Sequence, residues 1–80
     1  MSVESVFEDI VRVCEFYADP GETFEVDSEN YRVMLGGREI SPLMENGQLI
    51  THLVIEPDGV STWVDDLDSY FQRVFEWRER

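Results

Sequence analysis

The chain contains one histidine, His52, and one cysteine, Cys14, the side chains best suited to nucleophilic catalysis. A nucleophile needs a base within hydrogen-bond reach, so this pair could react only if the fold brought both residues to one face of a sheet. The alternative is structural: a buried thiol acts as a small apolar side chain, and a strand histidine packs against an aromatic ring. We therefore predict no catalytic residue and no enzyme activity. A lone cysteine also excludes an internal disulfide and is typical of a reducing compartment, so we expect a cytoplasmic protein.

Metal chemistry has two candidates. A zinc site needs about four nitrogen or sulfur ligands, which one cysteine and one histidine cannot supply within one chain. Asp65, Asp66 and Asp68 could hold Mg²⁺ or Ca²⁺ through oxygen, but the spacing of an EF-hand is missing, and helix capping explains all three aspartates. The sequence also lacks GxGxxG, P-loop and HExxH motifs. We predict no metal site and no cofactor.

The dominant chemical feature is acidity. Eighteen acidic residues stand against six arginines, with no lysine, and the net charge is −12. Residues 1–30 hold nine of the acids and one arginine, a local net charge of −8. Nucleic acid and anionic membranes would repel such a chain, so we expect direct binding to neither. The charge favours a basic partner, a salty environment or simple solubility.

The acids near the N-terminus also have a geometric pattern. On a helical wheel, Glu4, Glu8, Glu15 and Asp19 fall within a stripe about 60° wide, roughly opposite the apolar residues. Glu4 and Glu8 would lie about 6 Å apart along the axis, so the row could imitate a phosphate backbone and occupy a basic groove. The alternative is a solvated helix face. The predicted partner-binding residues are Glu4, Glu8, Glu15, Asp19, Glu22 and Glu25.

Two helices and five strands are predicted to position these residues. Apolar residues at three- and four-residue spacing indicate a helix over 2–18. Period-two patterns then predict strands over 23–27, 31–35, 38–41, 49–55 and 60–64. Residues 42–48 are expected to form a loop, and a second helix starts at Asp65, with Phe75 or Trp77 on its buried side and Arg73, Arg78 and Arg80 toward its C-terminal end.

These elements predict one α+β domain over residues 1–80, an antiparallel meander with both terminal helices on one face. Strand 49–55 is apolar on both sides, with Leu49, Leu53 and Ile55 on one face and Ile50 and Val54 on the other, which indicates a central strand. The second sheet face is therefore not wholly polar, and a partner, a homodimer mate or the loop over 42–48 could cover it. The chain has no apolar run of the ~18 residues that a membrane span needs and no basic start typical of a signal peptide.

Three functions fit these observations. The favoured one is a non-enzymatic acidic protein that docks on a basic protein surface, as an inhibitor, an immunity-type partner or a nucleic-acid mimic against a nucleic-acid-binding protein. Acidic phage-encoded inhibitors and toxin-immunity proteins share this size and charge, although no motif matches. The second is a domain adapted to high salt, with a regulatory or protein-interaction role. The third is a small enzyme or ligand-binding domain with a pocket near His52, Trp63 and Tyr31.

Overall fold

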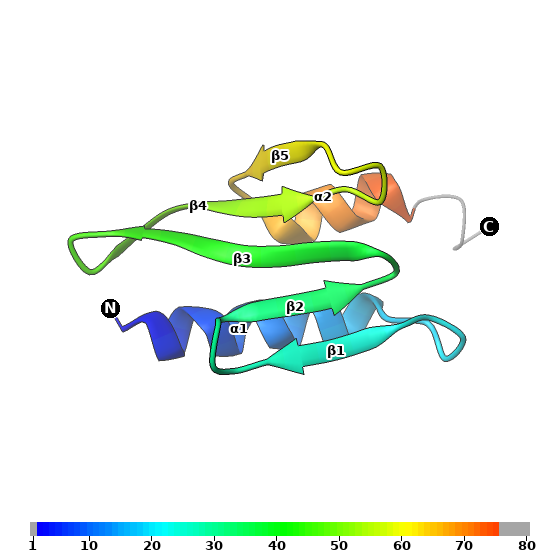
Figure 1. Ribbon diagram of the computed structural model, residues 1–80, viewed down its shortest axis with the longest axis horizontal. Coiled ribbons are helices and arrows are strands. Elements are labelled where there is room, and N and C mark those ends of the chain that lie inside the picture. The colour runs from blue at the N-terminus through cyan, green and yellow to red at the C-terminus, as the bar shows by residue number, and fades with distance from the viewer. Residues whose placement is uncertain (1, 76–80) are drawn as a thin grey trace.

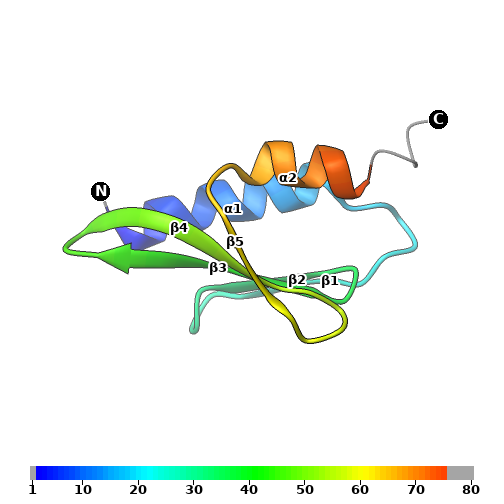
Figure 2. The same ribbon diagram turned by 90° about the horizontal axis from the view of Figure 1, so that it is seen from above.

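The computed structural model describes residues 2–75, which form two helices and one five-stranded sheet (Figure 1). In chain order these are α1 (Val3–Tyr17), β1 (Phe24–Asp27), β2 (Arg32–Leu35), β3 (Arg38–Glu45), β4 (Gln48–Ile55), β5 (Ser61–Val64) and α2 (Leu67–Val74). The strands are antiparallel and lie in the order β1-β2-β3-β4-β5. Figure 2 shows both helices on the same side of the sheet, so the predicted α+β meander is confirmed.

Helix α1 has clear local reasons to begin and end where it does. The Ser2 side chain caps it by accepting a hydrogen bond from the Ser5 N–H at 3.2 Å, which satisfies one of the free donors of the first turn. The helix ends at Tyr17, with Ala18 as its C-cap, ahead of Pro20, which disfavours helical geometry at the residue before it. Its buried side consists of Val6, Phe7, Ile10 and Cys14.

The core fills the space between the two helices and the sheet. Ile10 from α1 and Phe71 from α2 are at most 1% exposed, and they meet the fully buried Leu35, Ile40 and Val54 of the strands. Phe71 stacks on Phe75 with ring centroids 5.5 Å apart, and large aromatic areas of this kind dominate the stability of small domains. None of the described helices is long and apolar enough to cross a bilayer.

The prediction of a loop over residues 42–48 is wrong. Instead, β3 runs on to Glu45, Asn46 and Gly47 form a two-residue turn with φ of 53° and 76°, and β4 starts at Gln48. An Asn-Gly pair with both φ positive is the favoured connection of a tight hairpin. Pro42 does not stop β3 because the pairing of β3 with β2 ends at Ile40, and beyond that point β3 is an edge on that side, where proline is tolerated.

The predicted faces of the fourth strand are also wrong in part. The register shifts between Leu43 and Met44, so that Leu43 pairs with Thr51 and Met44 with Leu49, which leaves Ile50 as an extra residue. Such a bulge breaks the alternation of side chains. Leu49 therefore packs against the core on the same side as Val54, whereas Leu53, which pairs with Trp63, faces away from the helices.

The remaining boundaries differ by a residue or two. Helix α2 starts at Leu67 with Asp66 as its cap, and not at Asp65, whose carboxylate accepts a hydrogen bond from the Thr51 hydroxyl at 2.8 Å. Tyr31 lies outside β2 because its φ is 54°. The expected roles of Trp77, Arg78 and Arg80 lie outside the described residues.

Candidate functional site

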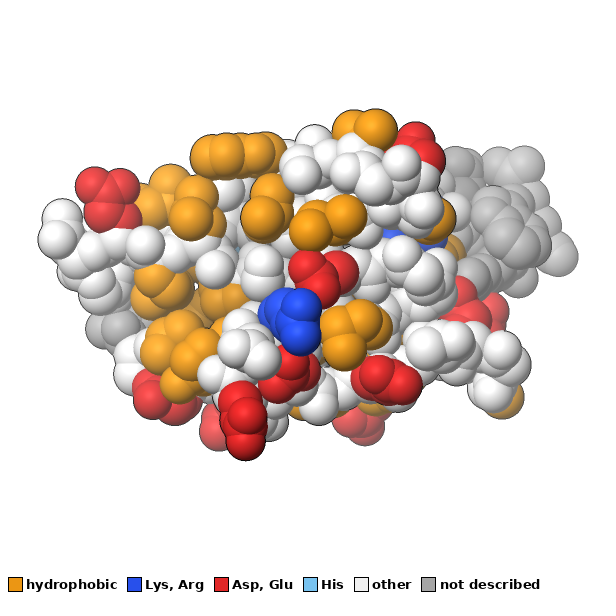
Figure 3. Space-filling model, viewed as in Figure 1, with side chains coloured by type: hydrophobic (Ala, Val, Ile, Leu, Met, Phe, Trp, Pro, Cys, Tyr) orange, Lys and Arg blue, Asp and Glu red, His pale blue; other side chains and the backbone are white. Residues whose placement is uncertain are grey.

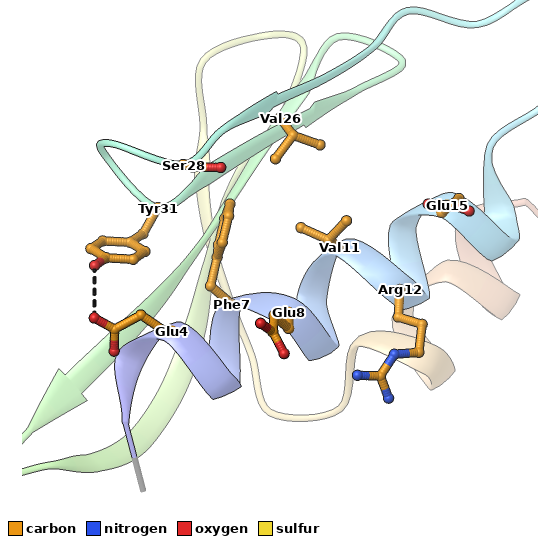
Figure 4. Close-up of a pocket in the computed structure, with 9 residues that line it drawn as sticks. All are labelled: Glu4, Phe7, Glu8, Val11, Arg12, Glu15, Val26, Ser28 and Tyr31. Carbon is orange, nitrogen blue, oxygen red and sulfur yellow. Dashed lines mark hydrogen bonds between the residues drawn. The ribbon is translucent and has the colours of Figure 1, made fainter.

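A groove of about 590 Å³ lies between α1 and the β1–β2 hairpin (Figure 4). Its floor is apolar and its helix side is acidic, with Ser28 and Tyr31 from the hairpin turn opposite. The lining residues are Glu4, Phe7, Glu8, Val11, Arg12, Glu15, Val26, Ser28 and Tyr31. An acidic wall above an apolar floor suits a ligand that carries positive charges on long aliphatic stems.

Three of the predicted partner-binding residues, Glu4, Glu8 and Glu15, share this wall. Together with Val11 they have the spacing i, i+4, i+7 and i+11, which places them in one row along a helix. We call this row the glutamate ridge. Glu8 lies about 6 Å, and Glu15 about 16 Å, from Glu4 along the axis. The ridge lies on the flank of α1 that faces the hairpin, so it borders the apolar floor (Figure 4).

The ridge carboxylates form no ion pair with the arginines of the described residues. Within residues 2–75, the ion pairs are Arg12–Asp9 at 3.2 Å, Arg32–Asp27 at 2.8 Å, Arg32–Glu39 at 3.0 Å and Arg38–Glu56 at 3.3 Å. None of these pairs involves Glu4, Glu8 or Glu15. The three negative charges are therefore available to a cation brought by a partner.

Tyr31 closes one end of the groove. The Asp27 side chain accepts hydrogen bonds from the N–H and the side-chain amide of Asn30 at 3.3 and 2.9 Å, and this turn leads into Tyr31 with its φ of 54°. The Tyr31 ring meets Phe7 edge-on at 5.5 Å, and its hydroxyl donates to Glu4 Oε1 at 3.4 Å. A positive φ at a bulky residue is uncommon and is often found at functional sites. The sequence marks the turn but not this placement of Tyr31.

The other three predicted residues lie elsewhere. Asp19 follows the end of α1, and its N–H donates to Glu22 Oε1 at 3.1 Å. Glu22 Oε2 lies so close to Gly36 that a Cβ there would be 2.6 Å away, which places the Glu22 side chain beside the β2–β3 turn. Glu25 pairs with Met34 on the sheet face away from the helices. The structure thus brings together three of the six residues.

The sheet face without helices forms a second distinct surface (Figure 3). Its apolar residues include Trp63, which is 66% exposed, and Leu43, which is 37% exposed. Arg32 is also on this face, where it bridges Asp27 and Glu39. The predicted cover by residues 42–48 is absent because these residues belong to the β3–β4 hairpin. This face therefore combines exposed apolar residues with an arginine paired to two acids, and Glu25 also lies on it.

His52, Trp63 and Tyr31, the residues expected to surround a small-ligand pocket, do not share one pocket. His52 is only 8% exposed, and its Nδ1 lies 2.8 Å from the Val64 carbonyl oxygen. Trp63 lies on the open sheet face, and Tyr31 lies in the groove. Burial raises the pKa of the Cys14 thiol to about 12, which disfavours the thiolate that acts as a nucleophile.

The aspartate cluster at the start of α2 has a structural role. Asp66 accepts hydrogen bonds from the Asp68 N–H at 3.1 Å and the Ser69 hydroxyl at 2.8 Å, and the Ser69 bonds are the main reason its pKa is lowered. Asp68 accepts from the Tyr17 hydroxyl. In the part of the chain that the structure describes, no three His, Cys, Asp or Glu residues are arranged to hold a metal ion.

Comparisons with protein-family models, with curated proteins and with solved structures found no match. The groove beside α1 is therefore described by its own lining, in which three carboxylates border an apolar floor.

Proposed function

We propose that this protein is a non-enzymatic binding protein whose groove takes a basic segment of another macromolecule. The observation that carries the proposal is the row Glu4, Glu8 and Glu15, which lies over an apolar floor and takes part in none of the ion pairs formed within residues 2–75. An arginine or lysine can place its aliphatic stem on Phe7, Val11 and Val26 while its charge reaches a ridge carboxylate.

The net charge supports the same function at longer range. A charge of −12 attracts basic partners before contact and increases the rate of association, an effect that falls as salt is added. Nucleic acid itself would be repelled. We infer that the partner is a basic protein, and a nucleic-acid-binding protein is the class whose surface would accept a row of negative charges about 6 Å apart. In that role the protein would block the nucleic-acid site as an inhibitor.

The test is selection of ligands from a library of random octapeptides on the folded protein at low salt. A matched pair of variants separates groove charge from total charge. Glu8→Gln/Glu15→Gln removes two ridge charges, and Glu29→Gln/Glu45→Gln removes two exposed charges that do not line the groove. We expect selected peptides to be enriched in arginine and lysine, to bind the control like the wild type, and to lose about tenfold in affinity for the ridge variant.

Two results would count against this function. One is a set of selected peptides with no excess of basic residues. The other is equal affinity of the basic peptides for the wild type and the ridge variant. For the nucleic-acid-mimic role, duplex DNA should compete with the protein for the selected peptides, since both ligands would offer the same negative charges.

A further inference from the structure

We infer that the ligand binds as an extended strand that pairs with the free edge of β1 and points alternate basic side chains at the glutamate ridge. This inference depends on the proposed function above, because it names the conformation and sequence pattern of the basic segment. It is carried by a second feature of the same site, the unpaired backbone of β1.

Strand β1 is the terminal strand of the sheet in the described residues, and its partner is β2. The Gly36 N–H donates to the Thr23 carbonyl at 2.9 Å, just before the strand begins. In an antiparallel ladder, residues alternate between those that bond the partner strand and those whose N–H and C=O point outward. From this position Glu25 and Asp27 bond toward β2, and the polar backbone groups of Phe24 and Val26 point away from the sheet.

Val26 links this free edge to the groove. Its side chain lines the groove floor and is 44% exposed, while its N–H and C=O point outward. Helix α1 and β1 both run along the long axis of the molecule (Figure 1). A strand added to β1 would therefore run beside the glutamate ridge, and every second side chain would point to the helix side, into the groove seen in Figure 4.

The spacing of the two elements predicts a sequence pattern. Side chains on one face of a strand repeat at about 6.7 Å. Along α1, Glu4, Glu8, Val11 and Glu15 follow at intervals of about 6, 4.5 and 6 Å. Long, flexible lysine or arginine side chains can absorb the small mismatch. The matching strand is basic-x-basic-x-apolar-x-basic, with the apolar position facing Val11.

Charge selects against a second copy of this chain as the occupant. Edge strands normally avoid self-pairing through charged side chains, and here β1 carries Glu25 and Asp27 on the sheet face away from the helices, while the glutamate ridge borders the groove on the helix side. Two copies with a charge of −12 each would bring these acids together, and the arginines nearest the groove and β1, Arg12 and Arg32, already pair with the chain's own acids. The ridge carboxylates, in contrast, attract a basic strand.

The experiment uses the octapeptide KTKTVTKT, which has this pattern, and the scrambled control TTKKKVTT, which has the same composition and charge. Amide hydrogen exchange is measured by NMR with and without peptide. At saturation with KTKTVTKT, we expect the amides of Phe24 and Val26 to gain protection of about tenfold or more. The amide of Glu25, which already bonds β2, should change little. The scrambled peptide should bind more weakly.

A backbone variant tests the hydrogen bond directly. Val26→Pro removes an outward donor without removing a bond to β2, and Val26→Ala is its matched control, since both shorten the side chain on the groove floor. Relative to Val26→Ala, we expect Val26→Pro to bind KTKTVTKT about fivefold to tenfold more weakly, the effect of one lost hydrogen bond. Thermal unfolding of both variants checks that the fold is retained.

The strand-pairing inference is overturned if KTKTVTKT binds both variants equally, if the Phe24 and Val26 amides stay unprotected at saturation, or if the peptide does not bind. The proposed function fails by a different result, the absence of basic ligands in the library selection. Basic ligands that need Glu8 and Glu15 but leave β1 unprotected would retain the function and exclude this mode of binding, as expected of a helical ligand lying in the groove.

Discussion

Removing charge from the glutamate ridge should stabilise the free protein while it weakens binding. In Glu8→Gln/Glu15→Gln, the repulsion between Glu4 and Glu8, about 6 Å apart, is lost; it is about 0.7 kcal/mol in water and about 0.4 kcal/mol when screened at ~0.1 M salt. Glu15 lies in the last turn of α1, where a carboxylate faces the negative end of the helix and costs about 0.4 kcal/mol. Arg12 lies one turn from both glutamates, and the loss of its attraction to them costs about 0.4 kcal/mol. The expected net gain is therefore about 0.4 kcal/mol, a rise in Tm of about 2–3 °C for a domain of this size.

The assay is thermal unfolding followed by circular dichroism at low salt, paired with affinity for a selected basic peptide. The control Glu29→Gln/Glu45→Gln reaches the same net charge as the ridge variant, and both of its positions are exposed. We expect the control to gain less than half of the stability found for the ridge variant and to bind the peptide like the wild type. Opposite effects on stability and affinity are typical of charges retained for function.

A ridge variant that melts below the wild type would refute this reasoning, because the ridge carboxylates would then contribute favourable contacts within the free protein. Equal gains in stability and equal losses of affinity in the two double variants would point to total charge and not to its location. That second result would favour a domain whose acidity is an adaptation to high salt.

Three further predictions concern the fold that holds the groove. Burial raises the pKa of Cys14 from 9.0 to about 12, and burial followed by the Glu56 hydrogen bond raises that of Tyr70 from 10.0 to about 12. The neutral forms therefore stabilise the fold below about pH 9, and the free energy of unfolding measured in urea should fall as pH rises toward 12. In Cys14→Ala, this free energy should fall less steeply with pH. Hydrogen bonds from Asn30 and then Arg32 lower the pKa of Asp27 to about 2, so its contribution should be present above about pH 4 and disappear as pH falls toward 2; Asp27→Asn should lack this pH dependence between about pH 2 and 4. Gly36→Ala should destabilise the fold by about 1–2 kcal/mol in urea unfolding, since Gly36 has a φ of 59° and a Cβ there would meet the Glu22 carboxylate, whereas Gly21→Ala, with open space around it, should have little effect.

Local patterns in the sequence predict most of the elements because each has its own signal. The apolar spacing of α1, the period-two strands and the Pro-Asp-Gly turn all agree with the structure. The errors occur where a local signal depends on a neighbouring strand. Pro42 is compatible with β3 only because β2 has already ended there, and the bulge at Ile50 depends on the register with β3. Neither dependence is visible in a single segment of sequence.

The candidate site could likewise be predicted only in part from the sequence. The glutamate ridge follows from helical periodicity, so Glu4, Glu8 and Glu15 could be identified before the fold was known. Their groove could not, because Phe7, Val26 and Tyr31 reach it from separate elements. Glu22 and Glu25 entered the prediction through charge alone; the structure places Glu22 beside Gly36 and pairs Glu25 with Met34 on the other face of the sheet.

The distribution of paired and unpaired charge gives the strongest reason to separate the two exposed surfaces. On the open sheet face, Arg32 lies between Asp27 and Glu39, and an apolar contact such as a homodimer through Trp63 would strengthen as salt rises. In the groove, the glutamates form a favourable electrostatic interaction only with a cation supplied by a ligand, and this interaction weakens as salt is added. Binding of a basic ligand in the groove and an apolar contact on the open sheet face would therefore respond to salt in opposite directions, and this difference distinguishes the two interactions.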